Sequence, residues 1–292
     1  MIEKGLFIVN AFWTNASMAR MTEMFLRAAS DQSIALSVVT NAALLADIQR
    51  GRAPEAAFAL LWDKDIRLGQ LLEAGGMPVF NSAAAIADCD DKTLTYLRLR
   101  DRDIPMPRTL LCPQTFPGCG YGEAAFVDEY AETLSCPFVV KEGCGSFGQQ
   151  VYLAHSADEA RDILKKAGAV PVLFQKFIRE SAGRDIRLYM VGGDCVAAME
   201  RVNLSGDFRA NIAGGGTARR YTPSPEEISL AARACEHLGL SFAGVDLLHA
   251  DEGALLCEVN SNAHFSALAA LTGADPAAAI LSYIRRKLCS AT

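Results

Sequence analysis

The sequence lacks the cysteine spacing that marks a zinc site or a disulfide framework. Its 292 residues include nine cysteines, an odd number, scattered without a C-x-x-C pair. Disulfide frameworks are typical of oxidising compartments, whereas isolated cysteines in a chain of this length are typical of a reducing one. We therefore expect a cytoplasmic protein with neither a disulfide framework nor a cysteine-bound zinc.

Long apolar runs and long basic runs are also missing. The apolar stretch after Lys4 is too short for a signal peptide, and no run approaches the length that a membrane helix needs. Lys and Arg number 28 against 34 Asp and Glu, which gives a net charge of −6, and the basic residues form no extended cluster. These absences argue against a membrane partner and against a nucleic-acid partner.

Two common nucleotide-binding motifs are absent as well. No G-x-G-x-x-G follows the first expected strand, so a standard dinucleotide site is not indicated. No G-x-x-x-x-G-K-[ST] occurs either, which excludes a Walker A loop. Any nucleotide site in this chain must therefore be built another way.

The first 80 residues alternate between expected strands and helices. Hydrophobic residues make up 51% of the sequence, enough for a large core. Strands that alternate with helices are typical of a parallel, doubly wound sheet. The expected strands are 5–10, 34–40, 58–62 and 78–80, with helices at 16–30, 41–50 and 66–74.

The stretch Gly244–Asn262 reads as two short strands joined by a turn at 251–253. If the turn is centred on position 252, Asp246 lies directly opposite Glu258, and Asn260 shares the face of Glu258. Two carboxylates and an amide oxygen that converge suit a hard cation, Mg²⁺ or Mn²⁺. The alternative is a polar hairpin face in water.

A glycine-rich segment at 142–148, E-G-C-G-S-F-G, lies between two expected strands, directly after Lys141. Glycine permits close approach of the backbone, so successive N–H groups can cradle a phosphate chain while a lysine supplies charge. A flexible turn remains the alternative interpretation.

Charged residues follow two further segments. In the expected strand 184–191, Asp185 and Arg187 share one face, either as solvated pairs or as part of a nucleotide site. The segment 203–220 reads as a polar, glycine-rich loop, in which Arg209 and Asn211 flank the glycine run. Loops of this length are often functional.

Taken in order, these motifs resemble the RimK-like group of the ATP-grasp superfamily, the carboxylate–amine ligases of alpha-L-glutamate type. The resemblance is strong from about Lys92 to the C-terminus and only architectural over the first 80 residues. The matching strings are P-F-V-V-K-E-G-x-G-S-F-G at 137–148, Q-K-F-I at 175–178, G-R-D-I-R at 183–187, G-D-F-R-A-N at 206–211, A-G-V-D at 243–246 and E-V-N at 258–260.

The resemblance implies an ATP-grasp fold with three parts. We expect an N-terminal Rossmann-like pre-ATP-grasp domain at 1–88, a central lid subdomain at 89–174, and a C-terminal subdomain with the metal site at 175–292. A homodimer or homotetramer is a reasonable expectation for such a protein.

The resemblance also implies roles for individual residues. The residues expected to act on the transferring phosphoryl group are Lys141, Arg187 and Arg209. Those expected to bind ATP are Lys92, Lys141, Gly145, Ser146, Phe147, Gln175, Lys176, Phe177, Ile178, Asp185 and Asn211. Those expected to bind two ions of Mg²⁺ or Mn²⁺ are Asp246, Glu258 and Asn260.

The implied reaction is ATP-dependent amide formation. A carboxylate attacks the γ-phosphorus to give an acyl phosphate and ADP, and an amine then displaces phosphate. The amine would come from an amino acid such as glutamate, and the carboxylate from a peptide, a protein tail or a small metabolite. Two alternatives remain open: phosphoryl transfer without amide formation, and a non-catalytic ATP-binding module.

The chain departs from the family pattern directly after E-V-N. RimK-like ligases usually continue with small residues and then Pro-Gly, whereas this chain continues S-N-A-H-F at 261–265. Asn262 and His264 are therefore candidate substrate residues, and His264 either binds substrate, acts as a base or is structural. The departure leaves the transferred amino acid open and the ATP and metal residues intact.

Overall fold

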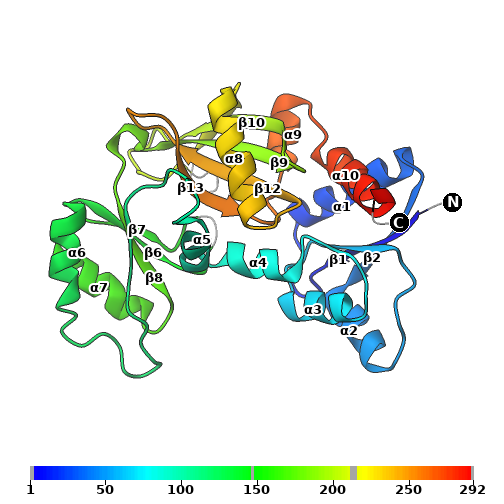
Figure 1. Cartoon of the computed structure of the whole chain (residues 1–292), viewed down its shortest axis with the longest axis horizontal. Helices are drawn as coiled ribbons and strands as arrows, with labels where there is room; N and C mark the ends of the chain where they lie inside the picture. Colours follow the sequence, from blue (N-terminus) through cyan, green and yellow to red (C-terminus); the bar gives the residue numbers. More distant parts are fainter. Residues whose placement is uncertain (1–2, 146–147, 211–215, 291–292) are drawn as a thin grey trace.

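The protein is built around three β-sheets (Figure 1). The computed structural model describes residues 3–145, 148–210 and 216–290. The mixed α/β architecture expected from the sequence is confirmed. In the part of the chain that is described, no single helix is long and apolar enough to cross a membrane, and one pair of helices, bent by 108°, passes that test only together.

The N-terminal sheet is parallel, with strand order β2-β1-β3-β4. Its central strand β3 reads F-A-L-L and is buried throughout, because helices cover both faces of the sheet. The order reverses between β1 and β3, and ligands commonly bind beyond the carboxyl ends of strands at such a point. Its elements are β1 (Glu3–Val9), α1 (Ala16–Asp31), β2 (Ile34–Thr40), α2 (Asn41–Gln49), β3 (Phe58–Leu61), α3 (Ile66–Ala74) and β4 (Val79–Phe80).

Two short helices, α4 (Ala83–Asp90) and α5 (Lys92–Leu99), connect this sheet to the rest of the molecule. They are separated at Asp91, whose backbone is extended and whose side chain accepts a hydrogen bond from the Thr93 N–H at 2.8 Å. This is ordinary N-capping, and it places Lys92 in the first turn of α5.

The central sheet is antiparallel, with order β5-β8-β6-β7. Its core includes Phe138 and Phe174, whose rings stack 5.3 Å apart. Because β8 ends at Lys176, the boundary expected after residue 174 falls within this strand. The elements are β5 (Thr109–Leu111), α6 (Phe126–Leu134), β6 (Phe138–Glu142), β7 (Val151–Ala154), α7 (Ala157–Ala167) and β8 (Val172–Lys176).

The C-terminal sheet has order β11-β10-β9-β12-β13. One face packs on α8, and the other on α1, α9 and α10. The expectation of a loop through 203–220 was wrong at its end, because 217–220 pair with β10 as strand β11. The elements are the short 3₁₀ turn η1 (Arg179–Ser181), β9 (Arg184–Val191), β10 (Asp194–Val202), β11 (Thr217–Arg220), α8 (Pro225–His237), β12 (Phe242–Leu248), β13 (Leu255–Asn260), α9 (Ser266–Thr272) and α10 (Pro276–Ser290).

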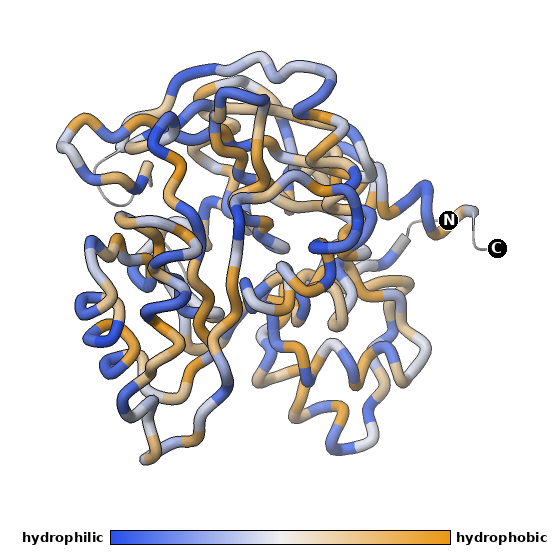
Figure 2. Tube along the Cα trace, turned by 60° about the vertical axis from the view of Figure 1, so that its left-hand side comes forward, coloured by the Kyte–Doolittle hydropathy of each residue, from blue (hydrophilic) through white to orange (hydrophobic). Residues whose placement is uncertain are grey.

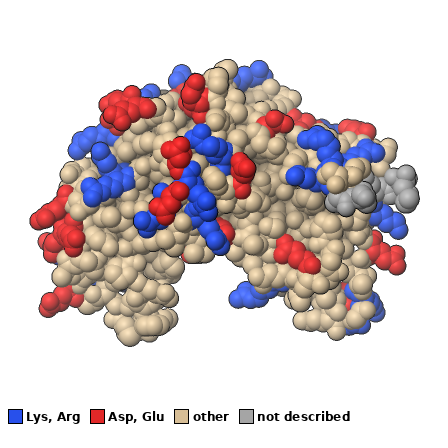
Figure 3. Space-filling view, in the orientation of Figure 1, with Lys and Arg blue, Asp and Glu red and all other residues tan. Residues whose placement is uncertain are grey.

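The central and N-terminal sheets form two lobes on either side of the C-terminal sheet, and both chain ends lie at the N-terminal lobe (Figure 1). In the turned view of Figure 2 the lobes remain separate, with hydrophilic residues on the outer turns of their helices. Positive and negative side chains are interspersed over the face drawn in Figure 3. The C-terminal sheet therefore contacts both lobes and forms one wall of any site between them.

Candidate active site

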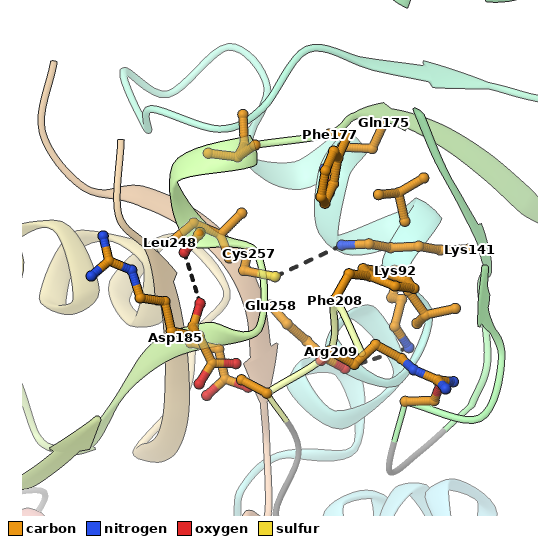
Figure 4. A pocket seen from close by; sticks show the side chains of 18 of the residues that line it. Lys92, Lys141, Gln175, Phe177, Asp185, Phe208, Arg209, Leu248, Cys257 and Glu258 are labelled. Carbon is orange, nitrogen blue, oxygen red and sulfur yellow. Dashed lines mark hydrogen bonds and ion pairs between the residues drawn. The ribbon is translucent and has the colours of Figure 1, made fainter. Parts of the chain in front are cut away.

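A cavity of about 850 Å³, including its open mouth, lies between the central sheet and the C-terminal sheet (Figure 4). Its size is in the range of small-molecule sites. Eleven of the residues singled out from the sequence line it: Lys92, Lys141, Gly145, Gln175, Lys176, Phe177, Ile178, Asp185, Arg209, Asp246 and Glu258. The fold thus brings together motifs that are far apart in the sequence.

Other predicted site residues lie elsewhere. Arg187, Asn260, Asn262 and His264 are not part of the cavity lining. The predictions for Ser146, Phe147 and Asn211 fall outside the described residues.

Cationic side chains enter the cavity from three different elements. Lys141 of β6 is 7% exposed, and its Nζ points toward Cys257 Sγ at 3.8 Å (Figure 4). Lys92 Nζ donates to the Gly145 carbonyl at 3.2 Å and lies 3.4 Å from Glu258 Oε1. Arg209 reaches from the 203–210 segment. These cations create a site that favours a polyanion.

Arg209 also connects two loops at the cavity mouth. Its Nη1 donates to the Gly148 carbonyl at 2.9 Å, and its other nitrogens pair with Asp207. Because Gly148 belongs to the glycine-rich segment, Arg209 holds that segment against the C-terminal part of the chain.

Two aromatic rings also line the cavity. Phe177 and Phe208 meet edge to face, with ring centroids 6.1 Å apart. Gln175 is buried, and its Nε2 donates a hydrogen bond to Thr109 Oγ1 at 2.9 Å. An apolar wall next to fixed polar groups suits a flat heterocycle with a few hydrogen-bonding atoms.

The β12–β13 hairpin confirms the predicted pairing of Asp246 with Glu258. Gly244 pairs with Asn260 in the same register, which puts Asn260 beside Glu258. The register then shifts by one residue, so Cys257 is an extra residue, a β-bulge. Consequently Cys257 and Glu258 both line the cavity, although they are consecutive. Burial raises the pKa of the Cys257 thiol to about 11, so it is not a thiolate nucleophile at neutral pH.

Asp246 is the centre of a buried ion-pair network. Arg187 donates to both of its oxygens at 2.7 Å, and Arg201 donates to Oδ2 at 2.9 Å. Arg201 also holds Asp185 through two bonds of 2.6 Å. Burial opposes ionisation of Asp246, but the two guanidinium groups outweigh it and lower the pKa of this carboxyl.

Arg201 was not predicted as a site residue, although it is 4% exposed and lines the cavity. The sequence did place it at the end of an apolar strand that follows the Gly192-Gly193 turn. A buried guanidinium between two carboxylates is a strong positioning device, because removing any member leaves a buried charge without its partner.

The acids and the amide fit a divalent cation in two respects. Among the described residues the Asn260 side chain makes no hydrogen bond, so its Oδ1, the atom that could bind a cation, is not committed to the fold, and its Nδ2 is buried without a partner. The three N–H donors on Asp246 leave capacity on a carboxylate that can accept about four bonds. In the described ranges no group of three or more His, Cys, Asp or Glu forms a metal cluster, and the candidate set instead combines two carboxylates with an amide.

Asn262 and His264 lie where the C-terminal sheet meets the N-terminal lobe. Asn262 is 4% exposed and donates to the Leu61 carbonyl at 2.6 Å, which favours a structural role. His264 is half-buried, and its Nδ1 lies 3.0 Å from Ser17 Oγ of α1.

Comparison with known proteins identifies this arrangement. The model of the RimK-like ATP-grasp domain matches residues 89–284. The chain belongs to the RimK-like ATP-grasp family. A probable alpha-L-glutamate ligase of Mannheimia succiniciproducens is 35% identical over 219 residues, which span 74% of this chain and 70% of the relative.

Other relatives of this RimK-like chain agree in class. Human beta-citrylglutamate synthase B is 34% identical over 226 residues, which span 76% of the chain but 56% of that enzyme. Two solved structures show the same fold: D-alanine–D-alanine ligase from Bacillus anthracis (TM-score 0.74, 17% identity, 100% of this chain and 98% of that one) and a RimK domain protein from Sphaerobacter thermophilus (0.71, 24%, 95% and 98%). The expected ATP-grasp fold is confirmed, and the RimK-like chain is an ATP-dependent carboxylate–amine ligase that forms ADP.

Proposed function

We propose that this ligase joins the amine of glutamate, or of a closely similar amino acid, to the carboxylate of a small metabolite, a peptide or a protein tail. The observation that carries the proposal is the cavity itself, whose lining combines Lys92, Lys141 and Arg209 with the paired carboxylates Asp246 and Glu258. The relatives named above act with glutamate according to their names, which supports glutamate as the amine substrate.

The cavity residues have separate tasks in this proposal. Phe177 and Phe208 hold the adenine ring, while Lys92 and Lys141 bind phosphate oxygens. The substrate carboxylate attacks the γ-phosphorus, ADP leaves, and Arg209 stabilises the charge spread over the transferring group. Two divalent ions, Mg²⁺ or Mn²⁺, held by Asp246, Glu258 and Asn260 would neutralise phosphate charge when bound.

We also propose a cellular compartment and an oligomeric state for this ligase. None of the nine cysteines forms a disulfide, which supports a reducing, cytoplasmic compartment. A homodimer or homotetramer is carried over from the family resemblance alone.

A screen of amino acids against candidate carboxylates, with ATP and Mg²⁺, tests the proposal. We expect ADP and phosphate only when both substrates are present, together with a product whose mass equals their sum less one water. Phosphorylated product without amide would indicate phosphoryl transfer instead. ATP binding without turnover across the whole screen would overturn the proposed ligation.

A further inference from the structure

We propose that His264 is the base that accepts a proton from the attacking amine, and that Ser17 positions it. This inference rests on the proposed function and extends it to the second half of the reaction, which the ATP cavity does not explain. It concerns the segment in which the chain departs from the family pattern.

His264 lies beside the phosphoryl-transfer machinery rather than within it. A Cβ on Gly244 would lie 2.6 Å from Ala263 Cβ and 3.6 Å from Arg187 Nε, so residue 263 and Arg187 pack side by side on β12. Arg187 donates to Asp246, which lies two residues after Gly244 on β12. The next residue, His264, is therefore a near neighbour of Arg187, whose charge acts on the imidazole.

The N-terminal lobe completes the surroundings of the imidazole. Ser17, in the first turn of α1, contacts Nδ1 at 3.0 Å, and the Trp13 ring lies 5.8 Å from the histidine ring. Within the described residues Nε2 makes no hydrogen bond, and it is not among the buried unpartnered atoms, so it stays open to solvent and substrate. One nitrogen is held by the fold and the other is available.

Burial and two nearby positive charges keep the His264 imidazole neutral. Burial, then Lys64 from the loop after β3, then Arg187 from β9 all lower the pKa of this imidazole below its ordinary 6.5. Lys64 is itself paired with Asp90 at 2.7 Å, and Ser17 and Trp13 are uncharged. With the Nδ1 proton donated to Ser17 Oγ, Nε2 carries a lone pair at neutral pH.

The proton balance of the step is simple. The substrate ammonium gives one proton to Nε2, and the resulting amine attacks the carbonyl carbon of the acyl phosphate. The C–N bond forms, the bond from that carbon to the phosphate oxygen breaks, and phosphate leaves with the electron pair. The second nitrogen proton ends on the phosphate, and the imidazolium returns its proton to solvent.

An assay with hydroxylamine in place of the amino acid distinguishes a general base from a structural residue. It is largely unprotonated at neutral pH and traps acyl phosphates as hydroxamates without help from a base. The experiment uses the full chain with a carboxylate found in the screen, and compares His264→Gln, Ser17→Ala and the control His155→Gln, which changes an exposed histidine directly after β7. Each is assayed with the amino acid and with hydroxylamine.

We expect His264→Gln to lower kcat with the amino acid by about 10²-fold, the usual contribution of a general base, and to leave hydroxamate formation nearly unchanged. Ser17→Ala should give a smaller loss of the same kind, and in His264→Gln the acidic limb of the pH profile should move to higher pH, because the substrate ammonium must then lose its proton to solvent. Raising the pH should restore part of the lost rate.

Equal loss of amide and hydroxamate in His264→Gln would show a structural role and overturn the inference, as would an unchanged amide rate. Failure of the unmodified enzyme to form ADP with any carboxylate is a different result, because it would overturn the proposed ligation as well.

Discussion

Arg187 and Asp246 form a two-pronged ion pair, with Nε–Oδ1 and Nη2–Oδ2 distances of 2.7 Å each. The arginine therefore covers the carboxylate that we propose as a metal ligand. A cation that binds Asp246 must share it with Arg187 or displace the guanidinium toward the phosphates. Arg201 also donates to Asp246 Oδ2 at 2.9 Å and can hold the carboxylate in place during that exchange.

Replacing Arg187 with methionine should uncouple metal binding from turnover. Without the competing guanidinium we expect Mg²⁺ to bind at least as tightly, while kcat falls about 10²-fold through loss of charge stabilisation at the phosphoryl group. Titration calorimetry gives the first quantity and ADP release the second. Arg184→Met is the control, since Arg184 lines the cavity and, among the described residues, its side chain donates only to the Glu180 carbonyl. Weaker metal binding in Arg187→Met would contradict the competition.

Asp246→Asn should destabilise the fold itself. The change leaves Arg187 and Arg201 without their shared counter-charge, and breaking a buried pair costs about 3 kcal/mol of unfolding free energy. Urea unfolding at pH 7 measures it. Asp162→Asn, which removes an exposed pair with Lys165, should cost under about 1 kcal/mol.

The stabilisation by Asp246 should also depend on pH. Its pKa is lower in the folded protein than the ordinary value of about 3.9, so its contribution is complete above that pH. It is lost as the pH falls through the folded pKa. The gap between wild type and Asp246→Asn should therefore narrow only below about pH 4. A gap that narrowed already near pH 6 would contradict the depressed pKa.

Lys141→Met should weaken ATP binding. Lys141 is nearly buried in the cavity wall and is the cation that we assign to the phosphates. Loss of a charge-assisted hydrogen bond is worth about 1.5–3 kcal/mol, or about 10- to 100-fold in Kd. Calorimetry with ATP and Mg²⁺ provides the test, with Lys166→Met on the outer surface of α7 as the matched change. An unaltered Kd would remove Lys141 from the site.

Asn81→Ala should loosen the N-terminal lobe. The buried Asn81 amide donates to the carbonyls of Phe242 and Ser261 at 2.9 and 2.8 Å, and accepts from Ser241 N–H at 2.7 Å. Truncation leaves these buried groups unpaired, at a cost of at least about 2 kcal/mol. Thermal unfolding and limited proteolysis should both report it, and Gln70→Ala, an exposed amide on α3, should change neither.

Some of this arrangement could be predicted because local rules determine it. The hairpin around Glu252 has a short turn, and the Asp246–Glu258 pair predicted from it is confirmed. The pairs nearer the turn are offset from the count by one residue, Leu247 with Leu256 and Leu248 with Leu255, and the bulge at Cys257 restores the predicted register. The doubly wound N-terminal sheet followed from its alternating pattern.

Other features depend on register shifts and long-range contacts, which the pattern of residue types does not predict. Counting from the turn at Gly192-Gly193 pairs Arg201 with Arg184, but a register shift at Val196 pairs it with Asp185 instead. Nothing in the residue types at that point marks the shift, so Arg201 was missed. The hydrogen bond of Asn262 joins it to Leu61 of β3, 201 residues away along the chain, and the local sequence carries no sign of this contact.

The bulge at Cys257 limits how this strand can change in length. Leu256 and Val259 are both 2% exposed in the core, while Cys257 and Glu258 between them both line the cavity. Deleting one residue would restore strict alternation, and either Glu258 would leave the cavity or Leu256 would leave the core. We therefore expect β13 to accept substitutions at position 257 but no insertion or deletion. Any library of variants built on this enzyme should keep the length of β13 constant.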